Sequence, residues 1–309
     1  MTDTLMETRD TSQLDPKDVI LTLNGFPLYG TDSFGVSWHT TFQQISGLFD
    51  GVGSTLETAS KAWTDGLYSN IPTRDGRTIT IEGLIYGACP EDLIRAWERF
   101  KATFALDNQL LTVQLGSINR QLTVKQSTSA PLIKWNGLTV LKWSISLISL
   151  SSYLYAGGDP TTGSTGLPYT TGGFVYPASG YGFGRKSDKS DTDWYFGEKQ
   201  VSGVITLLSN GGAPAPVTMR VDGPVINPVI THEPSGRVMA LDLTLGSGTY
   251  ILFDGERKQI LLNGADPLRG HVLRREWSYA YPGTNRWAFS AKEPNQQAQL
   301  TVSFRAAYI

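Results

Sequence analysis

The 309-residue sequence has one cysteine, three histidines and few charged side chains. Because Cys89 is alone, no disulfide can form within the chain, and His39, His232 and His271 lie too far apart to share the ligand spacing of a zinc site. Charged residues make up only 17% of the chain and its net charge is −2, so it lacks the basic footprint of a nucleic-acid or anionic-membrane binder. These shortages predict no metal, no cofactor and no sequence-specific contact with nucleic acid.

Long hydrophobic runs and enzyme motifs are missing as well. The longest apolar stretch, residues 138–150, is too short to span a bilayer and is interrupted by Lys142 and by serines. The first residues are polar and do not form a signal peptide. The motifs of serine hydrolases, phosphate-binding loops and zinc proteases do not occur. We expect a soluble protein that does not insert into membranes and has no catalytic residues.

The sequence does contain a succession of strand signals around one helix. Ile79 and Ile81 alternate with polar residues, as in a half-buried strand. Pro90 suits the first position of a helix, and apolar side chains then recur every three to four residues: Leu93, Ile94, Trp97, Phe100 and Phe104. This pattern predicts a helix over about residues 90–105, and Gly116-Ser117 predicts a type II′ hairpin turn after it. Asn-Gly pairs predict two further hairpin turns, at Asn24-Gly25 and Asn136-Gly137.

The chain divides by composition into four segments, and its fold class is expected to be mainly β. We expect a flexible tail over 1–17, a β domain with the helix over 18–155, a Gly-, Thr- and Ser-rich linker or exposed excursion over 156–193, and an antiparallel sandwich or barrel over 194–309. Residues 43–73 have no clear period. They are either a functional or interfacial loop or an ordinary insertion with a short helix.

Aromatic side chains in the last segment are the candidate binding residues. Sugars stack on exposed aromatic rings, so the glycan-binding candidates are Trp194, Tyr195, Trp277, Tyr279, Tyr281 and Trp287. The alternative is that these rings fill the core of the sandwich. A glycoside hydrolase would need two facing carboxylates, and the acidic residues of the segment cannot be placed across a cleft from sequence: Glu233, Asp242, Asp254, Glu256 and Glu276.

Taken together, these pieces resemble, in their order along the chain, the distal tail protein family of long-tailed, non-contractile bacteriophages, also described as siphovirus tail components or minor tail proteins. The resemblance is carried by residues 77–83, the helix over 91–104, residues 111–124, 210–217, 250–257, 261–264, 281–285 and 300–305.

The resemblance implies a ring-forming N-terminal domain of β-barrel type with one packed helix, and a C-terminal galectin-like sandwich. It also implies a homohexameric structural protein at the distal end of the virion tail, joined to the tail tube protein on one side and to the hub or baseplate protein on the other. Such a ring surrounds the DNA exit channel and is assembled in the host cytoplasm. Further candidate partners are the tape measure protein and host cell-wall glycans. A carbohydrate-binding module for host attachment is the alternative hypothesis, and a cell-wall hydrolase is a third.

Overall fold

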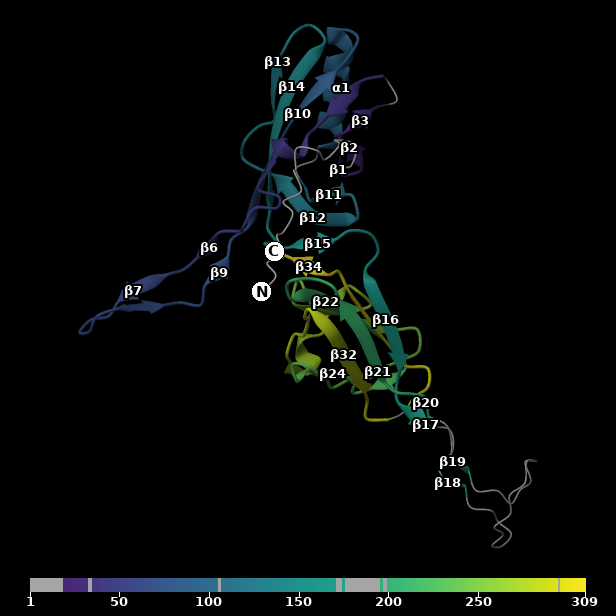
Figure 1. Cartoon of the computed structure of the whole chain (residues 1–309). Helices are drawn as coiled ribbons and strands as arrows, with labels where there is room; N and C mark the ends of the chain where they lie inside the picture. Colours follow the sequence, from purple (N-terminus) through teal and green to yellow (C-terminus); the bar gives the residue numbers. More distant parts are fainter. Residues whose placement is uncertain are drawn as a thin grey trace, which may run out of the picture. The chain divides into compact units, whose positions relative to one another are not determined.

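Most of the chain is β-strand, and α1 (Pro90–Thr103) is the one α-helix among the residues described by this computed structural model. Those residues are 19–32, 35–104, 107–170, 174–175, 195–196, 199–293 and 295–309. They form two units: residues up to 158 with 307–309, and residues 159–306 (Figure 1). The mainly β fold class is confirmed. The predicted tail over 1–17 lies outside the described residues, and the domain limits 18–155 and 194–309 stay predictions.

The first unit is built on one curved, barrel-like sheet. The strands of the whole unit are β1 (Val19–Leu23), β2 (Phe26–Pro27), β3 (Gly30–Thr31), β4 (Ser37–His39), β5 (Ile45–Ser46), β6 (Ser54–Thr55), β7 (Thr58–Ser60), β8 (Leu67–Ser69), β9 (Thr73–Arg74), β10 (Arg77–Tyr86), β11 (Gln109–Leu115), β12 (Ile118–Gln126), β13 (Leu132–Trp135), β14 (Val140–Ser149), β15 (Leu154–Ala156) and β34 (Ala307–Tyr308). The order along the sheet is β2-β1-β11-β12-β14-β10-β4-β3. The end of the chain returns to this unit, because β34 pairs with β15.

Helix α1 covers the inward face of this sheet as its apolar period predicts. Pro90 occupies the first turn, where a missing N–H costs nothing, and the buried side chains of the helix are Leu93, Ala96, Trp97 and Phe100. The Phe100 ring lies 5.5 Å from the ring of Trp38 in β4 and 5.8 Å from that of Trp143 in β14. Full burial of such a side chain contributes about 1.5–3 kcal/mol. The helix is therefore packed against the hydrophobic core of the first unit.

The predicted turns are borne out at two of three places. Asn24 and Gly25 both have positive φ, at 52° and 82°, as a type I′ turn requires. Gly116 has a positive φ of 55° while Ser117 does not, which fits a type II′ turn. The third turn is longer than the predicted pair Asn136-Gly137. Residues 136–139 join β13 and β14, and the Asn136 N–H donates to the carbonyl of Val140 at 3.0 Å. Strand β14 therefore begins later than the sequence suggested.

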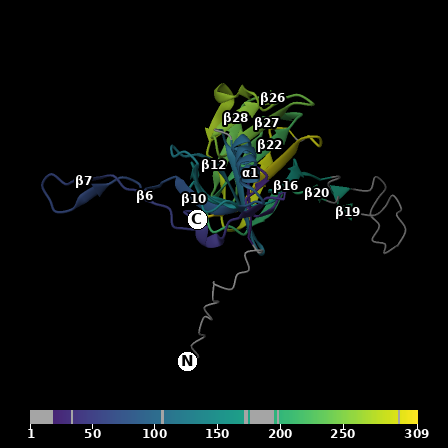
Figure 2. The same ribbon diagram turned by 90° about the horizontal axis from the view of Figure 1, so that it is seen from above.

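Residues 51–75 form a long hairpin, called the arm here, that extends away from the sheet of the first unit (Figures 1 and 2). It consists of two short antiparallel ladders, β6 with β9 and β7 with β8. An ordinary insertion with a short helix was one of two alternatives for residues 43–73, and no α-helix occurs among these residues. A single 3-10 turn, η3 (Phe42–Gln44), precedes the arm, and the arm itself is strand and turn.

The second unit consists mainly of two antiparallel sheets. Its strands are β16 (Thr161–Gly166), β17 (Tyr169–Thr170), β18 (Phe174–Val175), β19 (Tyr195–Phe196), β20 (Lys199–Val201), β21 (Val204–Ser209), β22 (Ala215–Asp222), β23 (Val225–Ile226), β24 (Val229–His232), β25 (Arg237–Leu241), β26 (Thr244–Leu245), β27 (Tyr250–Asp254), β28 (Gln259–Leu262), β29 (Asp266–Pro267), β30 (Val272–Arg275), β31 (Tyr279–Ala280), β32 (Gly283–Ser290) and β33 (Gln299–Phe304), with a 3-10 turn, η4 (Arg269–His271). One sheet has the order β16-β33-β22-β27-β28-β29 and the other the order β21-β32-β24-β25-β30.

The two sheets face each other across a buried apolar layer. Alternate residues of β22, Val217, Met219 and Val221, are buried, as are Trp287 and Phe289 of β32. The ring of Trp287 lies 6.1 Å from that of Phe304 in β33 of the opposite sheet. The predicted antiparallel sandwich is therefore confirmed, and its galectin-like character stays a prediction.

The start of the predicted linker is part of this sandwich. Thr161–Gly166 form β16, the edge strand beside β33, with Gly163 opposite Val302. A Cβ on Gly163 would lie 2.9 Å from side-chain atoms of Ile205 and Leu207, so the glycine permits this close packing. The sequence of β16 has few hydrophobic residues, which explains why this segment was expected to be a linker. Most of residues 171–193 lie outside the described part of the chain.

Candidate functional site

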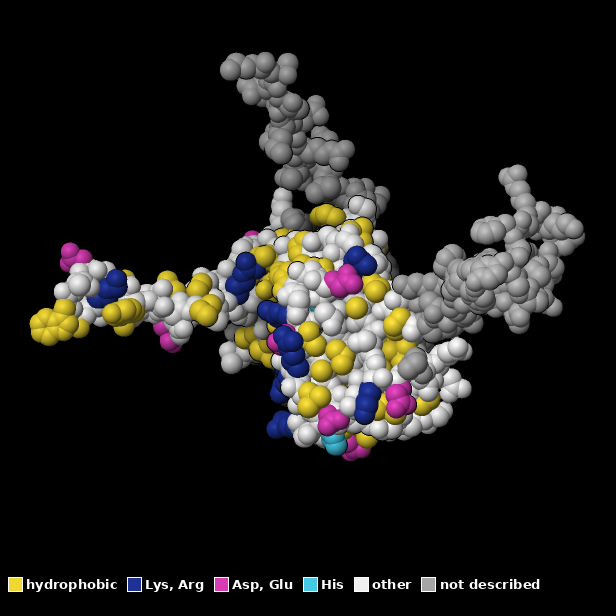
Figure 3. Space-filling view, turned by 90° about the horizontal axis from the view of Figure 1, so that it is seen from below, with side chains coloured by type: hydrophobic (Ala, Val, Ile, Leu, Met, Phe, Trp, Pro, Cys, Tyr) yellow, Lys and Arg dark blue, Asp and Glu magenta, His cyan; other side chains and the backbone are white. Residues whose placement is uncertain are grey.

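The arm presents apolar side chains to solvent. Its strands have no buried position, and the indole of Trp63 near the tip is 96% exposed. Four further apolar side chains of the arm are exposed: Leu56, Leu67, Tyr68 and Ile71. Figure 3 shows hydrophobic side chains in yellow along the projecting arm. A two-stranded ribbon is at best marginally stable alone, and contiguous exposed apolar side chains mark an interaction surface.

Arg77 fixes the base of the arm to the sheet. Its side chain is 3% exposed, and Nη1 donates to the carbonyl oxygens of Gly47, Leu48 and Asp50 at 2.8–3.0 Å. Nη2 lies 3.3 Å from the carbonyl oxygen of Ser152. Burial lowers the pKa of Arg77 below its ordinary value, and the charge of Asp50 opposes this shift. Arg77, which follows the arm in the chain, thus binds the segment that precedes the arm.

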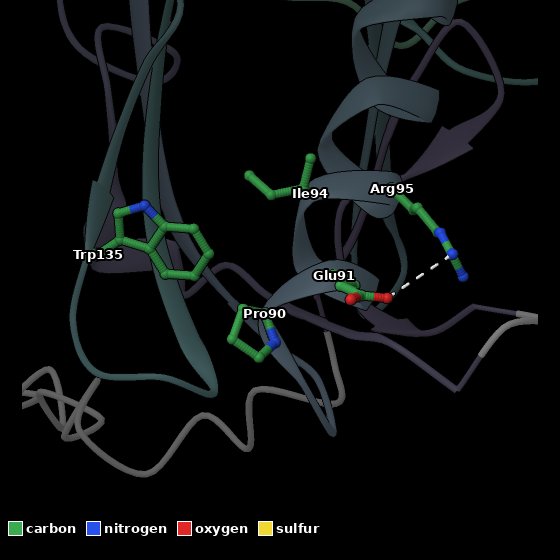
Figure 4. Close-up of a pocket in the computed structure, with 5 residues that line it drawn as sticks. All are labelled: Pro90, Glu91, Ile94, Arg95 and Trp135. Carbon is green, nitrogen blue, oxygen red and sulfur yellow. Dashed lines mark ion pairs between the residues drawn. The ribbon is translucent and has the colours of Figure 1, made fainter.

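A second apolar surface lies where α1 faces the hairpin of β13 and β14. Pro90 and Ile94 of the helix and Trp135 of β13 border a hollow of about 360 Å³ (Figure 4). The rim carries the ion pair between Glu91 and Arg95, with Arg95 Nη2 3.9 Å from Glu91 Oε2. The Trp135 side chain is 50% exposed. This hollow and the arm both belong to the first unit.

The structure describes the side chains of four of the six predicted glycan-stacking aromatics, and one of these four is buried. Trp194 lies outside the described residues, and of Tyr195 only the backbone in β19 is described. Trp287 was a wrong candidate, because its side chain is fully buried in the sandwich core and its Nε1 donates to Ser278 Oγ at 3.2 Å. Trp277 and Tyr279 are partly exposed and lie near Lys258.

The carboxylates considered for a hydrolase have structural partners in several cases. Glu233 Oε2 lies 3.1 Å from Arg286 Nε, and Glu276 Oε1 lies 2.8 Å from Arg274 Nε. Asp254 Oδ1 accepts the backbone N–H groups of Glu256 and Arg257, closing the turn after β27. The described residues include no group of three or more metal-ligating side chains and no helix long and apolar enough for a membrane span.

His232 is a buried histidine with a defined hydrogen-bonding role, which the sequence did not reveal. Asn285 Nδ2 donates to the carbonyls of Tyr281 and Gly283, so Asn285 Oδ1 is an acceptor and His232 Nε2, 3.2 Å away, carries a proton. His232 Nδ1 then accepts from Ser235 Oγ at 2.7 Å. Burial lowers the pKa of His232, the Arg237 charge adds to the shift, and the hydrogen bond to Asn285 opposes it.

We expect this histidine to make the second unit less stable in acid. The unfolded chain binds a proton at the ordinary His pKa of 6.5, whereas folded His232 resists protonation, so the free energy of unfolding falls as the pH drops through 6.5 towards the lower folded value. Urea unfolding between about pH 7.5 and 5.5 measures this slope. His232→Gln is expected to flatten it, and the exposed-site variant His271→Gln serves as the control. Equal slopes in both variants would contradict the assignment.

Comparison with known proteins found a family model for part of the second unit and solved structures with a similar fold. Residues 210–308 match the family model described as siphovirus-type tail component, C-terminal domain. The structure is similar to the crystal structure of the Dit protein (gp 19.1) of phage SPP1, with a TM-score of 0.61, 10% identity and coverage of 94% of this chain and 99% of that chain. That protein is described as a paradigm of the hub adsorption apparatus in phages that infect Gram-positive bacteria.

Two structures of the activated phage p2 baseplate, one with Ca and one with Sr, match with a TM-score of 0.49, 13% identity and coverage of 89% of this chain and 92% of that chain. No curated protein matches the sequence. At 10% identity the similarity to SPP1 Dit shows a shared fold, and it extends over both units. The resemblance to siphovirus tail components that the sequence predicted is therefore confirmed for residues 210–308, which match the C-terminal domain of that family.

Proposed function

We propose that this protein is a structural component of the siphophage tail tip whose copies associate into a closed ring, without catalysis. The ring connects the tail tube on one side to the hub or baseplate on the other and surrounds the channel through which DNA leaves. A structural role in the tail follows from the family of residues 210–308. Closure into a ring, which we expect to contain six copies, is our inference.

The observation that carries this proposal is the arm. Its apolar side chains have no core of their own, and the Trp63 side chain is almost fully exposed. In a ring each subunit uses two different patches, one to reach its neighbour and one to receive it. The arm suits the first role, because an extended chain from Gly51 to Trp63 spans about 40 Å, at about 3.3 Å per residue. The partner we propose for it is the first unit of a second copy.

Light scattering across a concentration series tests the proposal on the full chain. The expected species has six times the 33.8 kDa of a single chain and does not grow further as concentration rises. A closed ring saturates in this way, whereas an open heterologous contact continues into fibres. A mass that stays at 33.8 kDa at high concentration, together with tails that assemble fully without the protein, would overturn the proposal.

A further inference from the structure

The open edge of the sandwich contains a hollow of about 530 Å³. It lies between β28 and β29 at the end of one sheet and η4 and β30 at the end of the other. Its lining includes Arg257, Lys258, Arg269 and Arg275 together with Gln259 and Ile260. A volume of this size is in the range of sites that hold a small-molecule ligand, about 300–1,000 Å³.

The charge of the lining is entirely positive. Four of its side chains are cationic and none is a carboxylate. Arg257 has a distant partner, with its Nε 3.9 Å from Asp254 Oδ2, and Glu276 at the end of β30 is paired with Arg274 instead of Arg275. Within the described part of the chain, no carboxylate lies within 4.0 Å of the charged nitrogens of Lys258, Arg269 or Arg275. Like charges gathered in a concave site raise the local concentration of anions.

Contacts within the protein already fix the positions of two of these cationic side chains, Lys258 and Arg275. Lys258 Nζ donates to Tyr279 Oη at 2.8 Å and lies 4.3 Å from the Tyr279 ring centre and 5.2 Å from that of Trp277. Arg275 Nη2 donates to the carbonyl of Lys258 at 2.8 Å, and its guanidinium lies 5.7 Å from the Trp277 ring. Rings that attract a cation limit its motion, so Trp277 and Tyr279 position the charges.

We propose that this hollow binds an oligosaccharide that carries acidic groups, carboxylates or phosphates. Arginine forks bind such groups through two parallel hydrogen bonds, and Gln259 adds an amide that can bind sugar hydroxyls. The partly exposed Trp277 supplies an apolar surface beside the cations. The role of the aromatic residues thus changes from stacking on a neutral sugar to holding the cations that bind a charged one. The site is independent of ring formation.

Calorimetry on the full chain at low salt tests the ligand class with a matched pair. Tetragalacturonate and its methyl ester have the same rings and differ in charge, so the acid is expected to bind at least about tenfold more tightly than the ester. Its affinity is expected to fall as salt is added. Equal binding of acid and ester would overturn the proposal, and so would binding of inorganic phosphate or of a tetra-aspartate peptide as tight as that of tetragalacturonate.

Variants test the site itself. Lys258 has a positive φ of 58°, a conformation in which asparagine is enriched, so Lys258→Asn removes the charge while suiting the turn. Combined with Arg275→Gln, it is expected to weaken tetragalacturonate binding at least about tenfold, with an unchanged thermal midpoint. The control is Arg220→Gln in β22, an exposed arginine paired with Asp222 outside the hollow. An equal loss in the control would show non-specific attraction and overturn the site.

Discussion

Replacing Trp63, Leu67 and Ile71 of the arm by serine is expected to convert the associated protein into single chains of 33.8 kDa. All three side chains are exposed in the single chain, with Trp63 at 96% and Ile71 at 84%, so the fold loses no buried contact. If a neighbouring copy buries them, each contributes about 1.5–3 kcal/mol to every interface. The sum exceeds about 4 kcal/mol, which weakens each contact about a thousandfold.

Light scattering at matched concentrations gives the mass, and circular dichroism confirms that the variant is folded. The control replaces two exposed leucines of the second unit, Leu208 and Leu273, by serine. Exposed substitutions of this kind change stability by less than about 0.5 kcal/mol, so the control is expected to keep the full mass. If the arm variant also keeps the full mass, the arm is not the contact that joins the copies.

The parts of the fold that the sequence predicted best are those with one buried face and one solvated face. Strand β10 and helix α1 have strong periods of two and of about 3.6, and both occur where expected. The arm has no buried face, so its strands carry no alternation and the sequence offered only composition. Without a partner chain, periodicity cannot detect a ribbon whose apolar side chains face outward.

Strand β32 was missed for a different reason. It lies between β21 and β24 in its sheet, and its inward positions are Asn285, Trp287 and Phe289. A buried asparagine interrupts the apolar alternation that marks a strand. The structure accommodates it because both ends of its amide are hydrogen-bonded, to His232 and to the backbone around Tyr281. The same network explains why Trp287, expected as a sugar platform, points into the core.

The basic hollow could not be predicted because the sequence there is balanced in charge. The arginines and the lysine that line it are interspersed along the chain with four acidic residues: Asp254, Glu256, Asp266 and Glu276. Only the packing of the β28–β29 edge beside β30 separates the two signs, leaving the cations in the concavity and the carboxylates outside its lining. Net charge along the chain therefore says nothing about this site.

Arg77→Met is expected to destabilise the first unit by about 2–4 kcal/mol and to loosen the base of the arm. The substitution leaves the carbonyls of Gly47, Leu48 and Asp50 without their shared donor, in a place where the Arg77 side chain was 3% exposed. A Cβ on Gly47 would lie 1.9 Å from the carbonyl oxygen of Thr78, so this segment packs directly on β10 and has little room to rearrange.

Calorimetry is expected to show a thermal midpoint for the first unit lowered on the order of 10 °C, with the midpoint of the second unit unchanged. Limited proteolysis is expected to cut within residues 47–53 much sooner than in the unmodified protein, because opening there needs less free energy. Arg74→Met is the control: Arg74 is exposed, stands three residues earlier, and its guanidinium lies 5.9 Å from the centre of the Tyr153 ring. If both variants lose the same stability, the guanidinium of Arg77 does not hold the arm.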